Sequence, residues 1–236
     1  MNLKKQSLLK KWKYKLTYPK HVAFIMDGNR RWGKLNGFSN LQSYEKGRDV
    51  LESLIFSLEK KGVECVSCYT FSTENFSRSK EDIDSVMNVV SEYFVNLLNK
   101  GTNWKIIFSG NKTLLPNKLQ ELFSNIENKT KDNKGIIVNI LIGYGSQDEI
   151  INAAKKAQKE GEITKESFEK HLYSSNLPGI DMVVRTGGDK RLSNFMLYQV
   201  AYSELFFVDK LWCDFNEKDL DSLLDEYSSR QRNYGK

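Results

Sequence analysis

The stretch that decides the fold is His21-Val-Ala-Phe-Ile-Met-Asp27-Gly-Asn-Arg-Arg-Trp32. Its first six residues are almost wholly apolar, which is typical of a strand buried on both faces of a parallel sheet. The Asp27-Gly28 pair favours a turn and ends the strand, and a helical pattern of apolar residues follows. A strand that leads through a polar turn into a helix is the repeating unit of an α/β protein.

The same alternation continues to the C-terminus. Further strands are expected at 65–71, 104–108, 136–142, 182–184 and 205–208. Helices are expected at about 41–58, 83–97, 119–126, 164–172 and 217–229, and another begins at Ser146. Ser79-x-x-Asp82 and Ser146-x-x-Glu149 resemble capping boxes. Connections of helix length between the strands imply mostly parallel pairing. We therefore predict an α/β fold with a mostly parallel central sheet of about six strands flanked by helices, all in one domain over residues 21–236.

Composition narrows the class of protein. Of the 236 residues 39% are apolar and 28% charged, which is ordinary for a globular chain. The sequence has neither a long apolar run nor a secretion signal, so a cytoplasmic location is expected. Three cysteines and two histidines indicate structural thiols rather than disulfides or a zinc site. The net charge of +6 suits nucleic acid, anionic lipid or phosphorylated small molecules, and by itself selects none.

Residues 1–20 differ from the rest and are interpreted as a basic N-terminal arm. They hold seven lysines with Leu8, Leu9, Trp12 and Leu16 between them. A solvated arm and a surface helix that touches anionic lipid both fit this pattern.

Three arginine-bearing polar segments follow predicted strands, at 27–32, 72–78 and 185–194. Ligands of open parallel sheets bind at the carboxyl ends of the strands, so these segments are expected to converge there. Asp27 at a strand end suits either a turn cap or a Mg²⁺ ligand, since Mg²⁺ prefers one or two carboxylates together with phosphate oxygens.

The segment at 185–194 is suited to phosphate. Gly187 and Gly188 allow close approach of backbone N–H groups, and Arg185 and Arg191 are forked donors that match phosphate oxygens. Ser193 adds a hydroxyl. Neither a Walker A nor a G-x-G-x-x-G sequence occurs. From the residues alone we predict a magnesium-dependent enzyme, or a binding protein, for phosphorylated ligands.

These segments resemble the signature regions of the cis-prenyltransferase family, of the undecaprenyl diphosphate synthase type. The matching residues are His21–Trp32, Tyr69-Thr-Phe-Ser-Thr-Glu-Asn-Phe76 with Arg78, Asp181-Met-Val-Val-Arg-Thr-Gly-Gly188, Arg191-Leu-Ser-Asn-Phe195 and Tyr202-Ser-Glu-Leu-Phe-Phe207. The resemblance extends from about residue 21 to the C-terminus. It implies a homodimeric transferase with a hydrophobic tunnel. Such an enzyme condenses isopentenyl diphosphate with an allylic diphosphate, using Mg²⁺, to give a Z-polyprenyl diphosphate.

The resemblance also implies roles for single residues. Catalytic roles fall on Asp27, Ser72, Asn75 and Arg78. The implied Mg²⁺ ligands are Asp27 and Glu204. Substrate binding is implied for Gly28, Asn29, Arg30, Arg31, Trp32, Phe76, Arg185, Arg191 and Ser193.

Several positions depart from the family pattern. Asn40, Ser43 and Tyr44 stand where an Arg and a Gly-His are usual, Gln147 replaces an Arg, Lys190 a common His and Phe76 a Trp. These changes alter the donors expected around the first diphosphate. Thr70 in place of Ala, and a shorter stretch from 78 to 107, favour a product shorter than undecaprenyl.

Alternative functions remain open. One is a branching or cyclising synthase of the same fold that couples dimethylallyl units, and another is a weakly active partner subunit. A nucleic-acid binder is not expected, because no recognised binding module occurs. A lipid diphosphate product has to reach a bilayer, and lysines near anionic lipid favour contact with it, so the arm is a candidate for peripheral membrane contact.

Overall fold

The computed structural model describes residues 17–230, and the interpretation of the arm lies largely outside them. The strands are β1 (His21–Ile25), β2 (Cys65–Ser72), β3 (Lys105–Ser109), β4 (Ile137–Tyr144), β5 (Met182–Arg185) and β6 (Glu204–Phe207). They form one sheet in the order β3-β4-β2-β1-β5-β6, and every pairing is parallel. The predicted α/β sheet of about six strands is confirmed, with each strand within two residues of its expected bounds.

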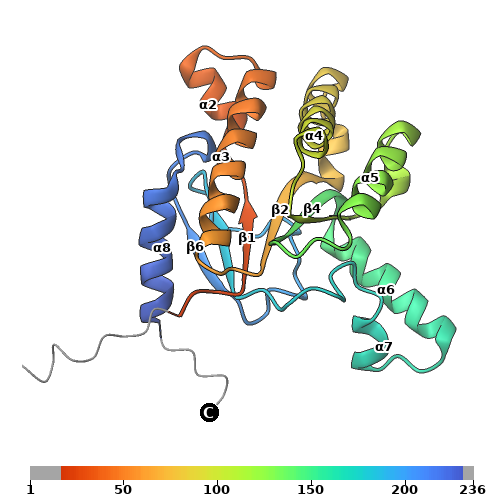
Figure 1. The fold of residues 1–236 in the computed structure, drawn as a ribbon. Coiled ribbons are helices and arrows are strands. Elements are labelled where there is room, and N and C mark those ends of the chain that lie inside the picture. Colours follow the sequence, from red (N-terminus) through yellow and green to blue (C-terminus); the bar gives the residue numbers. More distant parts are fainter. Residues whose placement is uncertain (1–16, 231–236) are drawn as a thin grey trace, which may run out of the picture.

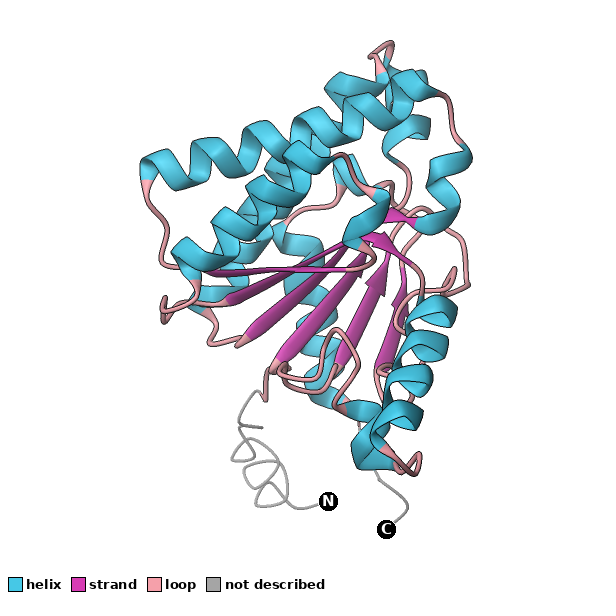
Figure 2. Ribbon diagram, turned by 90° about the vertical axis from the view of Figure 1, so that its right-hand side faces the viewer, coloured by secondary structure: helices cyan, strands magenta, loops and turns pink. Residues whose placement is uncertain are grey.

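Helices connect the strands and cover the sheet (Figures 1 and 2). The α-helices are α2 (Asn29–Asn36), α3 (Asn40–Lys60), α4 (Lys80–Lys100), α5 (Asn117–Thr130), α6 (Ser146–Glu160), α7 (Lys165–Glu169) and α8 (Glu217–Ser229). Short 3-10 turns are η1 (Thr73–Ser77), η2 (Lys112–Leu114) and η3 (Trp212–Asp214). The helical pattern after β1 forms two helices, since Gly37 ends α2 with a φ of 73° and Ser39 starts α3 with a capping box.

The two predicted capping boxes fare differently. Ser79 accepts the N–H of Asp82 as expected, but the Asp82 carboxylate does not return to the cap. The prediction for Ser146 is wrong: no side chain caps α6, and the Ser146 hydroxyl accepts the N–H of Leu197 instead. The Glu149 carboxylate accepts hydrogen bonds from the Tyr144 hydroxyl, the Tyr173 backbone N–H and the Gln199 side-chain amide. Both side chains are buried, so tertiary partners replace the local cap.

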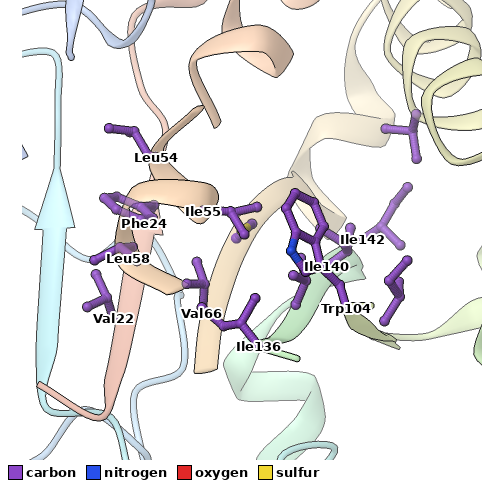
Figure 3. Packing of buried hydrophobic residues seen from close by; sticks show 14 of the residues in the cluster. Val22, Phe24, Leu54, Ile55, Leu58, Val66, Trp104, Ile136, Ile140 and Ile142 are labelled. Atoms are coloured by element: carbon purple, nitrogen blue, oxygen red, sulfur yellow. The ribbon is translucent and has the colours of Figure 1, made fainter. Parts of the chain in front are cut away.

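Alternating residues of β1 serve different layers of the core, as the pleat of a strand requires. Val22 and Phe24 join the larger cluster, to which α3, α4, α5 and α8 contribute, whereas Ala23 and Ile25 join a smaller one on the other face. Figure 3 shows side chains of α3 and the strands meeting in the larger cluster. Burial on both faces explains why β1 is a continuous apolar run.

A row of buried, hydrogen-bonded polar side chains crosses the sheet. The His21 ring bonds the Ser67 hydroxyl through Nε2 at 2.8 Å, and Asn139 donates to the same oxygen at 2.9 Å. Ser109 donates to Asn139 at 2.6 Å. The other ring nitrogen of His21 lies 2.8 Å from the carbonyl of Pro178. These bonds satisfy polar groups that would otherwise be costly to bury.

We expect acid to destabilise the protein through His21. Burial lowers the pKa of His21 to about 4, so the unfolded chain binds this proton at a higher pH than the folded chain does. The stability that the neutral ring confers is complete above pH ~6.5 and is lost as the pH falls toward 4, by about 2 kcal/mol at pH 5. Urea unfolding of the wild type and of His21→Asn at pH 7 and pH 5 measures the difference. The account of His21 is wrong if both proteins lose the same stability.

Candidate active site

A cavity of about 990 Å³ opens at the carboxyl ends of β1, β2 and β5. Its mouth is polar, and the side chains there include Asp27, Arg30, Arg31, Arg78, Arg185, Arg191 and Ser193. Further from the mouth the lining is mostly apolar and includes Leu51, Ile55, Val86, Val90, Phe94, Trp104, Val138 and Ile140. The site therefore joins a cationic entrance to an apolar interior between α3, α4 and the sheet.

Asp27 lies at the centre of the mouth. Its carboxylate accepts hydrogen bonds from Arg185 at 2.8 Å and from Arg31 at 3.1 Å. Partial burial works to raise the pKa of Asp27, but the hydrogen bonds and charges of Arg185 and Arg31 outweigh burial and lower the pKa below its ordinary value. Asp27 is thus an anion at neutral pH, held between two guanidinium groups.

Arg185 is the most deeply placed of the mouth arginines, with 3% of its surface exposed. Besides Asp27 it donates to the Ser193 hydroxyl at 2.8 Å and to the Arg191 carbonyl. Its Nε is buried and has no hydrogen-bond partner within residues 17–230. A buried guanidinium in this position can hold an anion that enters the mouth.

The loop after β5 has an unusual backbone. Gly187 has a φ of 87°, where other residues are strained, and a Cβ there would lie 3.1 Å from the Asp27 carbonyl oxygen, so the position favours glycine. Ser193 and Asn194 also have positive φ, at 49° and 61°. Such conformations cost energy in residues other than glycine and gather at functional sites. Here they hold the Ser193 hydroxyl against Arg185.

Asp189 is a site residue that the sequence analysis missed. Its carboxylate lies 2.8 Å from Arg191, 3.7 Å from Arg185 and 4.0 Å from Arg31. It therefore shares two guanidinium partners with Asp27. In the sequence, Asp189 is a carboxylate directly after the two glycines of an arginine-bearing loop. The sequence analysis considered only the cations and the backbone N–H groups of that loop.

A third carboxylate, that of Asp82, organises the other side of the mouth. It is 3% exposed and accepts from Tyr44 at 2.7 Å and Asn40 at 3.1 Å. Arg30 and Arg78 lie further from it, at 3.4 and 3.5 Å. Burial and the hydrogen bond to Asp82 raise the pKa of Tyr44, so its hydroxyl stays protonated and donates. Asn40 and Tyr44, two of the residues that depart from the family pattern, therefore donate to Asp82.

The turn residues Gly28 and Asn29 line the cavity as well. Gly28 has a φ of 110°, and a Cβ there would lie 2.8 Å from the Leu211 side chain. Asn29 donates its amide to the Met26 carbonyl at 3.0 Å. Ser72 and Asn75 form a reciprocal capping box at η1, and both line the cavity.

Three predicted site residues lie elsewhere. Trp32 stacks on Phe38 and donates to Asp214, and Phe76 packs edge-on against Phe71; neither lines the cavity. Glu204 begins β6 in register with Met182 and forms an ion pair with Arg230 at 2.7 Å. It lies roughly 16 Å from Asp27 along the strand direction. Within one chain Glu204 and Asp27 are not brought together.

The mouth as a whole is built for an anion. Five guanidinium groups, of Arg30, Arg31, Arg78, Arg185 and Arg191, face three carboxylates, of Asp27, Asp82 and Asp189. No cluster of three or more His, Cys, Asp or Glu side chains is placed to hold a metal ion within residues 17–230. A positive mouth above an apolar interior defines a site for an amphiphile with a phosphate-like head.

The sequence of the whole chain points to the same class of ligand. Residues 25–235 match the family described as "Putative undecaprenyl diphosphate synthase". The chain belongs to this prenyltransferase family and is a transferase.

Curated relatives agree along nearly the full length. An isoprenyl transferase of Fusobacterium nucleatum is 40% identical over 221 residues, covering 92% of this chain and 96% of the relative. A "tritrans,polycis-undecaprenyl-diphosphate synthase (geranylgeranyl-diphosphate specific)" of Thermoplasma volcanium is 36% identical and covers 92% of this chain and 89% of the relative.

Solved structures confirm the fold. Lavandulyl diphosphate synthase from Lavandula x intermedia, crystallised with dimethylallyl diphosphate, matches with a TM-score of 0.87 at 31% identity, covering 93% of this chain and 99% of that one. A probable undecaprenyl diphosphate synthase from Campylobacter jejuni matches with a TM-score of 0.79 at 31% identity, covering 93% and 100%.

Proposed function

We propose that this protein elongates an allylic diphosphate with isopentenyl diphosphate to give a Z-polyprenyl diphosphate. The observation that carries the proposal is the arginine-rich mouth set directly above an apolar cavity. The mouth suits two diphosphate heads, and the apolar interior suits a growing hydrocarbon chain. The family and the relatives support prenyl transfer as the reaction class.

Different groups at the mouth would bind the two substrates. Arg30 and Arg31 begin α2 beside Asp27 and would hold the allylic diphosphate. Arg185, Arg191 and Ser193 adjoin one another and would hold isopentenyl diphosphate. Negative charge grows on the allylic diphosphate as its C–O bond breaks, and fixed guanidinium groups stabilise that charge.

Proton removal completes the condensation. A new C–C bond forms at the terminal alkene carbon of isopentenyl diphosphate, and a proton then leaves its C2. Ser72, Asn75 and Arg78 follow β2 at the mouth. We propose that they orient the isopentenyl group and that the proton passes to a phosphate oxygen or to water beside them.

The donors at the mouth fit Mg²⁺ held jointly with substrate. Asp27 and Asp189 share the guanidinium groups of Arg31 and Arg185, and Mg²⁺ takes one or two carboxylates together with phosphate oxygens and water. Bound there, Mg²⁺ would neutralise charge on the departing diphosphate. Glu204 would join such a site only if it came from another subunit, because it lies at the far end of the strands.

A branching or cyclising synthase is the second candidate. Asn40 and Tyr44 are engaged by Asp82, and a solved relative with this fold is a lavandulyl diphosphate synthase. Incubation with dimethylallyl diphosphate alone separates the two functions. Chain elongation requires added isopentenyl diphosphate, whereas coupling of dimethylallyl units proceeds without it.

Product length should depend on Tyr93. Its hydroxyl donates to Glu52 at 3.2 Å, and both residues line the cavity, joining α4 to α3. This pair lies about 12 Å beyond Tyr44 along α3, and we infer that it limits the space for the growing chain. We expect a product shorter than undecaprenyl, and we expect Tyr93→Ala to shift it by at least one isoprene unit to longer chains. Product chromatography measures the shift.

Tyr198→Ala is a matched control, because Tyr198 also donates to a glutamate, Glu169, at 2.8 Å but does not line the cavity. An unchanged product distribution in Tyr93→Ala would show that the Tyr93–Glu52 pair does not limit the chain.

We propose a cytoplasmic homodimer. β6 is at one edge of the sheet and offers a surface for a second copy, which is also the arrangement that would let Glu204 approach another subunit. Sedimentation should give twice the chain mass of 27.3 kDa. A monomer that is fully active would refute the dimer.

A further inference from the structure

The turn between α2 and α3 presents apolar side chains to solvent beside the cavity mouth. We call residues 34–42 the hairpin tip. Leu35 is 78% exposed, Phe38 46% and Leu41 41%. Single exposed apolar residues are common, but three within seven positions form a patch that calls for a partner.

The tip is held in place by specific contacts. Gly37 ends α2 in the left-handed region, and the Ser39–Gln42 capping box starts α3. Phe38 stacks on Trp32 with ring centroids 5.1 Å apart, and the Trp32 indole donates to Asp214 at 2.7 Å. The contacts of Trp32, which keep it out of the cavity, therefore fix the tip and its exposed apolar groups.

Charge restricts what can cover this patch. Residues 28–44 contain Arg30, Arg31 and Lys34 and no Asp or Glu. Residues 1–16 hold six lysines and no acidic residue, so like charges disfavour that segment as an occupant. The same argument disfavours the tip of a second copy. An anionic surface with an apolar layer complements both features.

We propose that the hairpin tip docks the protein on an anionic lipid bilayer. Leu35, Phe38 and Leu41 would enter the boundary between headgroups and acyl chains, and Lys34 would pair with lipid phosphates, as in interfacial segments generally. No helix within residues 17–230 is long and apolar enough to span a membrane.

The position of the hairpin tip connects membrane docking with the cavity. Lys34 and Asn40, within the tip, also line the cavity, so docking would turn the mouth toward the membrane. This step rests on the proposed function, since a polyprenyl diphosphate leaving the mouth would then reach lipid directly.

The tip follows the carboxyl end of β1, whereas the basic arm leads into its amino end. In Figure 1 the α2–α3 turn and the entry to β1 lie at opposite ends of the molecule. The tip and the arm are thus separate hypotheses.

Co-sedimentation of the full chain with vesicles tests the proposal. The probes are vesicles of phosphatidylcholine with and without phosphatidylglycerol. The variant is Leu35→Ser with Leu41→Ser, which leaves the Phe38–Trp32 stack intact. Its matched control is Ile151→Ser with Ile163→Ser, two residues that are 51% and 50% exposed on and after α6. A third protein lacks residues 2–15.

We expect the wild type and the control to bind anionic vesicles equally, and the tip variant to bind at least tenfold more weakly. Lack of wild-type binding, or full binding by the tip variant, would overturn the proposal. Loss of binding only on deletion of residues 2–15 would assign the contact to the arm instead. Turnover of water-soluble substrates without vesicles should be unchanged in the tip variant; its loss would show that the tip covers the active site rather than a membrane. Binding needs no catalysis, so an inactive protein that docks normally would refute the proposed function alone.

Discussion

Asp27→Asn should lower kcat by roughly 10³-fold, because it removes the carboxylate that accepts hydrogen bonds from both Arg31 and Arg185 at the mouth. Asparagine keeps the volume of the side chain but lacks the charge that would bind Mg²⁺ and balance two guanidinium groups. The substrates' heads would still meet the arginines, so KM should change much less than kcat. Steady-state kinetics with isopentenyl diphosphate and an allylic primer measures both.

Asp221→Asn is the matched control for Asp27→Asn. Asp221 is an exposed carboxylate that pairs with Lys61 at 3.1 Å, away from the mouth. Its substitution should leave kcat and KM as in the wild type. Activity of Asp27→Asn within tenfold of the wild type would mean that the chemistry does not depend on this carboxylate.

Asp82→Ala should both destabilise the protein and weaken its binding of the allylic substrate. Asp82 is buried and serves four donors, Tyr44, Asn40, Arg30 and Arg78. Its removal would leave these groups without their acceptor, at a cost of about 3 kcal/mol in the free energy of unfolding. Urea unfolding measures this loss. KM for the allylic diphosphate should rise about tenfold, since Arg30 loses its orientation.

A double-mutant cycle separates the Tyr44–Asp82 hydrogen bond from general damage. Tyr44→Phe removes only the hydroxyl, and the two changes together should cost about 1–2 kcal/mol less than the sum of the single changes. Strict additivity of the changes in unfolding free energy would show that Asp82 and Tyr44 are not energetically coupled. Asp49→Ser provides a control, because it removes a carboxylate whose one ion-pair partner within residues 17–230 is the adjacent Arg48.

The strands were predictable because burial on both faces leaves near-continuous apolar runs, as in 21–26 and 136–142. The convergence of Asp27, Arg185, Arg191 and Ser193 was predictable as well, because parallel strands end at one edge of the sheet. The structure places these four residues together at the mouth. In both cases a local pattern and a rule of topology were sufficient.

Side-chain partnerships between distant segments were not predictable in the same way. Asp82 was interpreted as a capping residue, yet its carboxylate binds Tyr44, which is 38 positions away. Ser146 and Glu149 likewise take tertiary partners in place of a local box. Trp32 and Phe76 follow strands with the expected polar segments, but local packing turns both rings away from the cavity. Sequence spacing fixes the position of a residue on an element, and its partner depends on packing.

The most direct test of the central claim is incorporation of radiolabelled isopentenyl diphosphate with Mg²⁺. Dimethylallyl, geranyl, farnesyl and geranylgeranyl diphosphates serve in turn as primers, followed by chromatography and NMR of the product. We expect incorporation with at least one primer, new double bonds of Z geometry, chains shorter than undecaprenyl, and loss of the signal when the metal is chelated. No incorporation with any of the four primers would contradict chain elongation as the function of this site.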